Sequence, residues 1–390
     1  MQPQSNTEKQ QIMKKLKVMT VVGTRPEIIR LSATIKLLDK YTNQVFVHTG
    51  QNYDYELNEI FFEDLGLRKP DHFMNVSRDS LGAAIGDIFK KTEEIINLEK
   101  PDALLVLGDT NSCLSAYMAK RKHIPIFHME AGNRSFDFNV PEEINRRIID
   151  HIADFNLVYT EHARRHLISE GLQHRRIYLT GSPMWEVLQQ NMDKIENSKI
   201  LSKLDLEEKK YFMVSVHREE NVDNADNLKQ ILTVLNELAE QYKLPVIVST
   251  HPRTRKRIEA LADQSQVRNH QLHFLKPFGF TDYVNLQKNA LCTISDSGTI
   301  SEESAMLSFP AISLRQSMER PEAQDAGTII LTGFDADVVL NSVKTVIEEQ
   351  KEGGYKSIPD EYRIENTSWR VVKLILGNTK LSNQWWGVNK

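Results

Sequence analysis

The stretch ALLVLGDT at residues 103–110 decides the fold class, because five apolar residues lead directly into a small, polar end that carries Asp109. A second stretch, IPIFHMEAG at residues 124–132, repeats this design and leads to Glu130. Short apolar runs that end in small and polar residues are typical of buried parallel strands. Since ligands bind beyond the carboxyl ends of such strands, we expect Asp109 and Glu130 to line one crevice.

Strand and helix patterns alternate along the rest of the chain, which indicates an α/β protein. Further strand patterns lie at residues 16–22, 44–49, 155–159, 177–180, 211–216, 245–249, 272–274, 291–295 and 311–314. Helix patterns lie at residues 28–40, 58–65, 81–97, 112–122, 142–151, 225–242, 253–263, 281–289, 299–307, 336–349 and 367–376. Together they predict two doubly wound, Rossmann-like domains in tandem.

The expected boundaries follow from this alternation. We predict a disordered extension at residues 1–12, an N-terminal domain at 13–183 and a C-terminal domain at 184–365. The last segment, residues 366–390, is expected to form a helix that packs back on the N-terminal domain. A ligand site is expected in the cleft between the two domains.

The bulk composition describes an ordinary globular protein of 390 residues, of which 40% are hydrophobic and 26% charged. That length exceeds one comfortable core and favours two domains. A net charge of -4 and the lack of an apolar run of about 20 residues predict binding to neither nucleic acid nor a membrane. Two cysteines and a polar start favour a cytoplasmic protein, and leave open whether Met1 or Met13 is the natural start.

A third carboxylate, Glu142, follows in the stretch PEEINR at residues 141–146. Acidic groups gathered at one crevice are what the removal and return of a proton require, so we predict proton transfer at Asp109, Glu130 and Glu142. A metal site is the alternative for carboxylates near histidines. The chain has no H-E-x-x-H motif and no paired cysteines, so we predict no metal.

Two strand–helix turns have the composition of phosphate sites. In the first, GTRPE at residues 23–27, free backbone N–H groups at a helix start would act together with Arg25 and Arg30. The alternative is a plain turn with solvated arginines. The absence of a G-x-G-x-x-G motif argues against a dinucleotide at this turn.

The second turn, DSGTISEE at residues 296–303, repeats that arrangement. We predict that a pyrophosphate binds at Ser297 and Gly298, and that Glu303 accepts hydrogen bonds from ribose hydroxyl groups. A helix N-cap by Asp296 or Ser297 is the alternative, but it leaves the cluster of small residues unexplained.

Two histidines follow strand patterns in the second half of the chain. His217 has Arg218 beside it, which favours a functional role, whereas His251 has weaker support; a structural role stays open for both. His128, two residues before Glu130, is interpreted as an orienting or packing group. Three basic pairs without interleaved aromatic residues are interpreted as solvated faces or salt-bridge partners: Arg146-Arg147, Arg164-Arg165 and Arg175-Arg176.

Taken in order, these motifs resemble the non-hydrolysing UDP-N-acetylglucosamine 2-epimerase family. The resemblance runs from about Lys15 to Gly333, and the ordered set is far more specific than any single motif. The motifs are GTRPE at residues 23–27, TGQ at 49–51, GDT at 108–110, EAG at 130–132, PEEINR at 141–146, HREEN at 217–221, DSG at 296–298 and ERPE at 319–322.

The resemblance implies a fold like that of GT-B glycosyltransferases, with the catalytic carboxylates in the first domain and UDP held mainly by the second. It implies that a carboxylate removes the C2 proton while UDP leaves C1, and that the proton returns to the opposite face of a bound 2-acetamidoglycal. It implies no cofactor, and a homodimer. The implied catalytic residues are Asp109, Glu130, Glu142 and His217, and the implied UDP- and sugar-binding residues are Arg25, Arg30, His251, Phe278, Ser297, Gly298, Glu303 and Arg320.

The chain departs from the main family pattern at four places. Glu219 replaces an arginine, Asn133 replaces a leucine, and residues 51–55 and 135–140 differ. These variants resemble the capsule and O-antigen branch, which makes UDP-N-acetyl-L-fucosamine from UDP-2-acetamido-2,6-dideoxy-L-talose, and this is the expected reaction. The alternative is conversion of UDP-N-acetylglucosamine to UDP-N-acetylmannosamine. The missing arginine leaves allosteric control by the substrate open.

Three rival functions were weighed against this expectation. A retaining GT-B glycosyltransferase would carry a glutamate eight positions before Glu303, where this chain has Ser295. A hydrolysing 2-epimerase, which releases UDP and free sugar, stays open. A non-enzymatic module that binds a sugar nucleotide does not explain the three carboxylates.

Overall fold

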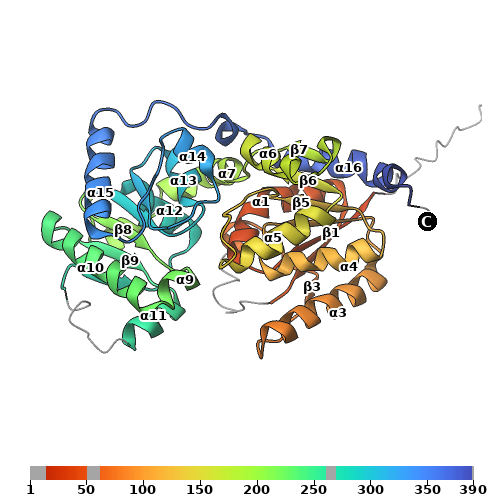
Figure 1. Cartoon of the computed structure of the whole chain (residues 1–390), viewed down its shortest axis with the longest axis horizontal. Coiled ribbons are helices and arrows are strands. Elements are labelled where there is room, and N and C mark those ends of the chain that lie inside the picture. The colour runs from red at the N-terminus through yellow and green to blue at the C-terminus, as the bar shows by residue number, and fades with distance from the viewer. Residues whose placement is uncertain (1–14, 51–61, 261–268, 389–390) are drawn as a thin grey trace, which may run out of the picture.

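The computed structural model describes residues 15–50, 62–260 and 269–388. The expected extension at residues 1–12, the two candidate starts and the divergent loop at residues 51–55 lie outside the described residues. The chain forms two lobes side by side, each built around one parallel sheet (Figure 1). The predicted fold class, two doubly wound α/β domains in tandem, is therefore confirmed.

The first sheet shows why an uninterrupted apolar run becomes a central strand. Its order is β3-β2-β1-β4-β5-β6-β7, and every side chain of the central β4 is buried. Helices pack on both faces, so both faces of this strand are buried and its residues are apolar. The strands are β1 (Lys17–Val22), β2 (Asn43–His48), β3 (His72–Phe73), β4 (Ala103–Leu107), β5 (Ile126–Met129), β6 (Phe155–Val158) and β7 (Ile177–Leu179). The helices are α1 (Arg25–Tyr41), α3 (Leu81–Glu99), η1 (Asn111–Leu114), α4 (Ser115–Arg121), α5 (Pro141–Ile152), α6 (Glu161–Ser169) and η2 (His174–Arg176).

The second lobe repeats the arrangement around a parallel sheet of order β10-β9-β8-β11-β12-β13. Its strands are β8 (Phe212–Ser215), β9 (Val246–Ser249), β10 (Leu272–Leu275), β11 (Cys292–Ser295), β12 (Ala311–Ser313) and β13 (Ile330–Leu331). The remaining helices are α7 (Met184–Glu196), α8 (Ile200–Lys203), α9 (Glu219–Val222), α10 (Ala225–Tyr242), α11 (Pro252–Glu259), α12 (Phe280–Asn289), α13 (Ile300–Leu307), α14 (Pro321–Asp325), α15 (Ala336–Lys351), η4 (Asp360–Arg363) and α16 (Thr367–Trp386).

One apolar cluster holds the two lobes together. It contains Ile28 of α1 in the first lobe, Val187 of the connecting α7 and Val284 of α12 in the second. After α15 the chain returns to the first lobe, where α16 lies against α1 (Figure 1). There the ring centroids of Tyr41 and Trp369 are 5.4 Å apart. The lobes therefore share both a core and a returning helix.

Several elements differ from the sequence expectation for a physical reason. β3 and β13 have two residues each, too few to show a period. The helix expected at residues 112–122 begins instead as the 3-10 turn η1 and continues as α4. The last helix runs on to Trp386 rather than ending at residue 376. The helices expected at 58–65 and 253–263 lie partly outside the described residues.

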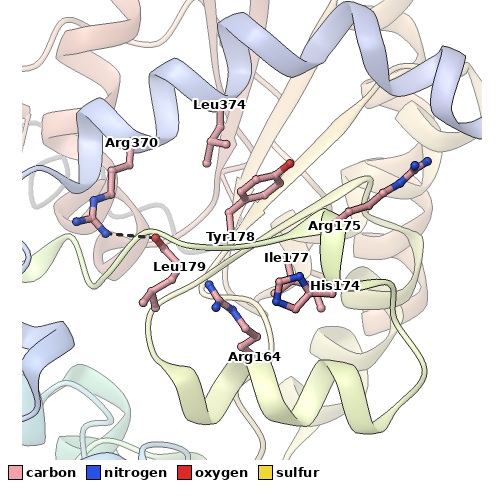
Figure 2. Close-up of a pocket in the computed structure, with 8 residues that line it drawn as sticks. All are labelled: Arg164, His174, Arg175, Ile177, Tyr178, Leu179, Arg370 and Leu374. Carbon is pink, nitrogen blue, oxygen red and sulfur yellow. Dashed lines mark hydrogen bonds between the residues drawn. The ribbon is translucent and has the colours of Figure 1, made fainter.

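A pocket of about 580 Å³ lies at the outer edge of the first sheet, between β7, α6, η2 and α16 (Figure 2). Arg370 donates to the carbonyl of Leu179 at 3.3 Å and so covers part of the free edge of β7.

The interpretation of residue pair 175–176 as a solvated face is wrong for Arg176. This residue is buried, and its guanidinium lies 3.7 Å from the Trp386 ring centroid. Among the described residues, no helix combines the length and apolar character that a bilayer crossing requires.

Candidate active site

The carboxyl ends of β4 and β5 bring two of the predicted carboxylates to one edge of the first sheet. Leu107 of β4 pairs with Met129 of β5, so Asp109 and Glu130 follow neighbouring strand ends. Glu130 has a φ of 64°, a left-handed conformation that a residue other than glycine adopts only where its surroundings hold it. Gly132 then turns the chain against α6, where a Cβ would lie 2.4 Å from the carbonyl oxygen of Ala163.

Asp109 is held by a cation from one of the basic pairs that were interpreted as solvated faces or salt-bridge partners. Arg146 of α5 is completely buried and forms an ion pair with Asp109, so the salt-bridge interpretation is confirmed for this residue. The side-chain amide of Asn145 donates to the carbonyl of Asp109 at 2.9 Å and fixes its backbone. Burial raises the pKa of Asp109, Arg146 opposes this, and the negative charges of Glu130 and Glu319 raise the pKa further.

Glu130 lies between two arginines from different lobes. Arg30 of α1 donates to one carboxylate oxygen, and Nη2 of Arg320, which precedes α14, lies 3.2 Å from the other. Burial alone would raise the pKa of Glu130, but Arg30, Arg320 and Arg146 together hold it below its ordinary value. Glu130 is therefore an ionised group that connects the two lobes.

Glu142 lies in the first turn of α5, where Pro141 starts the helix. Its side chain is half-buried, and the charge of Asp109 acts on it. Burial raises the pKa of Glu142, and the charge of Asp109 raises it further. Of the three predicted carboxylates, Glu130 is therefore ionised, whereas the pKa values of Asp109 and Glu142 are raised.

His217 follows β8 in the second lobe and is oriented by a buried acid that sequence reasoning treated only as a possible cap. Asp296, which follows the neighbouring strand β11, accepts from the backbone N–H groups of His217 at 3.0 Å and Arg218 at 2.9 Å. Its Oδ1 also lies 3.3 Å from Nδ1 of His217. The His217 side chain remains about half exposed, at 46%, and is free to meet a ligand.

Arg25 and His251 approach His217 from opposite lobes. His251 caps α11, and its ring nitrogen accepts from the N–H of Arg253 at 3.3 Å. Burial lowers the pKa of His251, and the nearby positive charges of His217, Arg25 and Arg253 lower it further. Arg25 and the two histidines therefore share one electropositive region at the junction of the lobes.

The GTRPE turn differs from the phosphate site that its composition suggested. Its own acid, Glu27, accepts hydrogen bonds from the N–H of Gly23 at 3.0 Å and the hydroxyl of Thr24 at 2.8 Å, and a further one from Ser112. Glu27 is buried, and its carboxyl group occupies the turn; burial raises the pKa of Glu27, and the hydrogen bonds that it accepts oppose this. Arg30 is also not solvated, because it is directed to Glu130. Arg25 is therefore the residue of this turn that remains a candidate for binding a phosphate group.

In the second turn, side chains from several segments gather over Gly298. A Cβ there would lie 3.6 Å from Arg315, 3.7 Å from Glu319 and 3.8 Å from Arg218. Arg320 donates from Nε to the Gly298 carbonyl at 2.9 Å and from Nη1 to Glu302 at 2.7 Å. The guanidinium of Arg320 is thus shared among protein acceptors, and its contact with a nucleotide stays a prediction.

The other predicted binding residues lie around this turn or beyond it. Ser297 forms a hydrogen bond with the Thr299 side chain at 2.9 Å, but Thr299 precedes α13 and no side chain of the described residues caps this helix, so the cap alternative is wrong. Glu303 is buried on α13 and accepts from Gln287 at 2.8 Å. Phe278 packs in an apolar cluster with Tyr211 and Tyr283. Whether these side chains contact UDP stays a prediction.

Five functional candidates were missed by sequence reasoning, although each lies in or beside a motif it used. They are Arg146, Asp296, Glu302, Arg315 and Glu319. The available signal was local: Glu319 begins the ERPE motif, and Asp296 begins the DSG motif. Over residues 15–50, 62–260 and 269–388, no group of three His, Cys, Asp or Glu side chains is arranged to hold a metal ion.

The model for the family described as UDP-N-acetylglucosamine 2-epimerase matches residues 36–376. The chain belongs to this family. It is an isomerase, and the resemblance inferred from the ordered motifs is confirmed at the level of the family. The glycosyltransferase and binding-module alternatives are therefore set aside.

Solved structures of relatives have the same architecture. A UDP-N-acetylglucosamine 2-epimerase from Rickettsia bellii is 49% identical, with a TM-score of 0.89 over 95% of this chain and 100% of its own. The enzyme from Methanocaldococcus jannaschii, solved with UDP-GlcNAc and UDP, is 33% identical, with a TM-score of 0.86 over 92% of this chain and 99% of its own. A curated UDP-N-acetylglucosamine 2-epimerase from Methanococcus maripaludis is 35% identical over 93% of this chain and 99% of its own. The GT-B-like epimerase fold is thereby confirmed.

Proposed function

We propose that this epimerase inverts C2 of UDP-N-acetylglucosamine and interconverts it with UDP-N-acetylmannosamine. The sequence departures favoured the L-talose derivative, but the names of the similar proteins favour this alternative, and the Methanocaldococcus jannaschii enzyme was solved with UDP-GlcNAc. One observation carries the proposal: Glu130 of the first lobe and Arg320 of the second lie 3.2 Å apart. Because Arg320 also donates to the carbonyl of Gly298, this contact brings Glu130 of the first lobe close to the DSG turn of the second.

The proposed reaction proceeds by elimination and re-addition. A carboxylate takes the C2 proton, the C2–H electrons form the C1=C2 double bond, and the bond from C1 to the UDP oxygen breaks with its electrons on UDP. UDP then adds back to C1 of the 2-acetamidoglycal as a proton reaches C2 on the opposite face. Since C2–H is a very weak acid, cations around the departing diphosphate have to stabilise its charge.

We assign the two carboxyl groups with a raised pKa to proton exchange at C2. A proton has to leave one face and return to the other, which needs two groups that can each change protonation state. Asp109 and Glu142 fit this role, since burial raises the pKa of each. Glu130 is held ionised by Arg30 and Arg320, and acts through its charge and by connecting the lobes.

We assign the diphosphate to the region between the DSG turn and the electropositive side chains around it. The positive end of the α13 dipole and the positive charges of Arg25 and Arg218 would favour an anion there. His217, half-exposed and oriented by Asp296, would donate to the leaving oxygen. The binding roles of His251, Phe278, Ser297 and Glu303 belong to the same proposal.

The pH dependence of kcat/KM is expected to show an acid limb above the ordinary range of carboxyl groups. Because burial raises the pKa of Asp109 and Glu142, their proton-accepting forms are lost, as pH falls, at a higher pH than in exposed carboxyls. Glu142→Gln should remove one ionisation from the pH profile. Initial rates between about pH 4 and 9 would measure both effects; an activity that stays constant down to pH 4 would contradict the assignment.

A second substrate is favoured by one specific feature. Residues 135–140, which depart from the main pattern, lead directly into the helix that carries Glu142. In this segment Phe136 and Phe138 are 65% and 66% exposed, so two apolar rings lie close in sequence to Glu142. A 6-deoxy sugar such as 2-acetamido-2,6-dideoxy-L-talose presents a methyl group to such a surface.

The substrate proposal is tested by offering both nucleotide sugars to the purified protein. We expect UDP-N-acetylglucosamine to equilibrate with UDP-N-acetylmannosamine, with a kcat/KM well above that for the L-talose derivative. Anion-exchange chromatography and ¹H NMR would separate the epimers. Turnover of the L-talose derivative alone would replace the main proposal by the second, and release of free sugar with UDP would identify a hydrolysing enzyme.

We also propose a cytoplasmic homodimer. The two cysteines are free and buried, as a reducing compartment permits. Tyr117 of α4 and Ile144 and Ile148 of α5 expose 39%, 49% and 43% of their surface on adjoining helices of the first lobe. An apolar surface of this kind is suited to a second copy of the chain.

Light scattering on a size-exclusion column is expected to give twice the chain mass of 44.9 kDa. Changing Ile144 and Ile148 together to aspartate should shift the protein to the monomer mass, because two charges would enter the apolar surface. Leu98→Asp on α3, also exposed at 69%, is the matched control and should remain dimeric. A monomeric wild-type protein would contradict the proposal.

A further inference from the structure

A buried carboxylate outside the predicted catalytic set joins the two halves of the site. Glu319 lies just before α14, and its side chain is only 6% exposed. Its oxygens lie 2.9 Å from Nη2 of Arg315, 3.4 Å from Nη2 of Arg218 and 3.4 Å from Nη2 of Arg146. Arg146 belongs to the first lobe and the other two arginines to the second, so this single acid contacts both lobes.

Two of these arginines lead directly to proposed catalytic side chains. Arg146 forms the ion pair with Asp109 through the same Nη2 that faces Glu319. Arg218 follows His217 in the chain, and its Nε donates to the carbonyl of Asp296 at 3.1 Å. Glu319 therefore contacts the same arginine that pairs with Asp109, and it also contacts the arginine that follows His217 in the chain.

The charge of Glu319 is what keeps these arginines together. Three guanidinium groups, two of them buried and that of Arg218 partly buried, repel one another unless an anion lies between them. A carboxylate can accept several N–H donors at once. Burial would raise the pKa of Glu319, but Arg146, Arg218 and Arg315 hold it well below its usual range. The group is thus an anion throughout the working pH range.

We propose that Glu319 is a positioning residue of the epimerase reaction, which orients Arg146 against Asp109 and Arg218 beside His217 where the lobes meet. This role rests on the proposed function. Glu319 touches no reacting atom in this account and acts only through the two arginines. Removing its charge should leave the nucleotide bound but misplace the groups that exchange the proton and assist the leaving oxygen.

The test variant is Glu319→Gln, which keeps the shape and removes the charge. We expect kcat to fall by about 10–100-fold, as is typical when the outer partner of a functional group is lost. The UDP affinity measured by calorimetry should change by less than kcat, although Glu319 also contacts Arg218 beside the proposed diphosphate site. A purely structural role would lower thermal stability but would not separate kcat from UDP affinity in this way.

The acid limb of the pH profile gives a second readout. The charged and titratable groups around Asp109 are Arg146, Glu130, Glu142, Cys113 and Glu319. Because the negative charge of Glu319 raises the pKa of Asp109, its removal should move the acid limb to lower pH. Glu322→Gln is the matched control: Glu322 is equally buried but accepts from Tyr362 at 2.9 Å, so the limb should not move.

Glu319→Asp completes the test, since it keeps the charge on a side chain shorter by one methylene. It should fold, lower kcat by less than the glutamine variant, and leave the acid limb in place. Should Glu319→Gln fold poorly, a wild-type kcat in Glu319→Asp would overturn the proposal, as would a wild-type kcat and limb in Glu319→Gln. An inactive wild-type protein would instead contradict the proposed function itself.

Discussion

Asp109→Asn is expected to lower kcat for epimerisation by about 10²–10⁴-fold, the range for loss of a general acid–base group. Asparagine keeps the shape of the side chain but cannot take up or return the C2 proton. The fold should survive, because Arg146 retains the carboxylates of Glu143 at 3.2 Å and Glu319 at 3.4 Å. Binding of UDP should also survive, since Asp109 lies in the lobe that holds the sugar.

Steady-state kinetics with UDP-N-acetylglucosamine and calorimetry with UDP would measure the two effects. Asp102→Asn is the matched control, because Asp102 precedes the same strand β4 at its opposite end. Its side chain accepts the backbone N–H of Lys17 at 2.8 Å, and its replacement should leave kcat unchanged. A kcat near that of the wild-type protein in Asp109→Asn would remove Asp109 from the mechanism.

Glu130→Gln is expected to have two large effects. Loss of the charge should lower kcat by about 10²–10³-fold, the range for loss of one preorganised electrostatic group, because Glu130 holds Arg30 and Arg320 in the site. It should also reduce the free energy of unfolding by up to about 3–5 kcal/mol, the cost of removing one partner from a buried ion pair. Two buried guanidinium groups would otherwise remain next to a neutral amide.

Thermal and urea unfolding would measure the loss of stability, and kinetics below the transition would measure the loss of rate. Glu130→Asp keeps the charge and should recover part of the stability but little of the rate, since its shorter side chain cannot reach both arginines. An unchanged unfolding free energy in Glu130→Gln would show that this ion pair does not connect the lobes as we infer.

The fold and one edge of the site could be predicted because they depend on local patterns. The apolar run at residues 103–107 is long enough to identify a buried strand, and Asp109 follows directly from it. Glu130 follows the neighbouring strand in the same way, and parallel strands bring their carboxyl ends to one edge. The two-residue strands β3 and β13 have no such pattern.

The remaining part of the site could not be predicted because it depends on how the lobes meet. Arg146 is polar, lies on an amphipathic helix and reads as solvated, yet Glu319 of the other lobe covers it. Glu27 could likewise be read as a surface acid, although it fills the turn in which a phosphate was expected. Such pairings are fixed by tertiary contacts between distant segments, which no local period encodes.

The most direct test of the central claim follows C2 of UDP-N-acetylglucosamine in D₂O with the wild-type protein. By ¹H and ³¹P NMR, both epimers should lose their C2 proton signal to deuterium while the nucleotide stays attached through its diphosphate. This result requires that the C2–H bond breaks and that the sugar is still attached to UDP at the end of each turnover. Formation of the second epimer with its C2 proton retained from the substrate would contradict elimination and re-addition at this site.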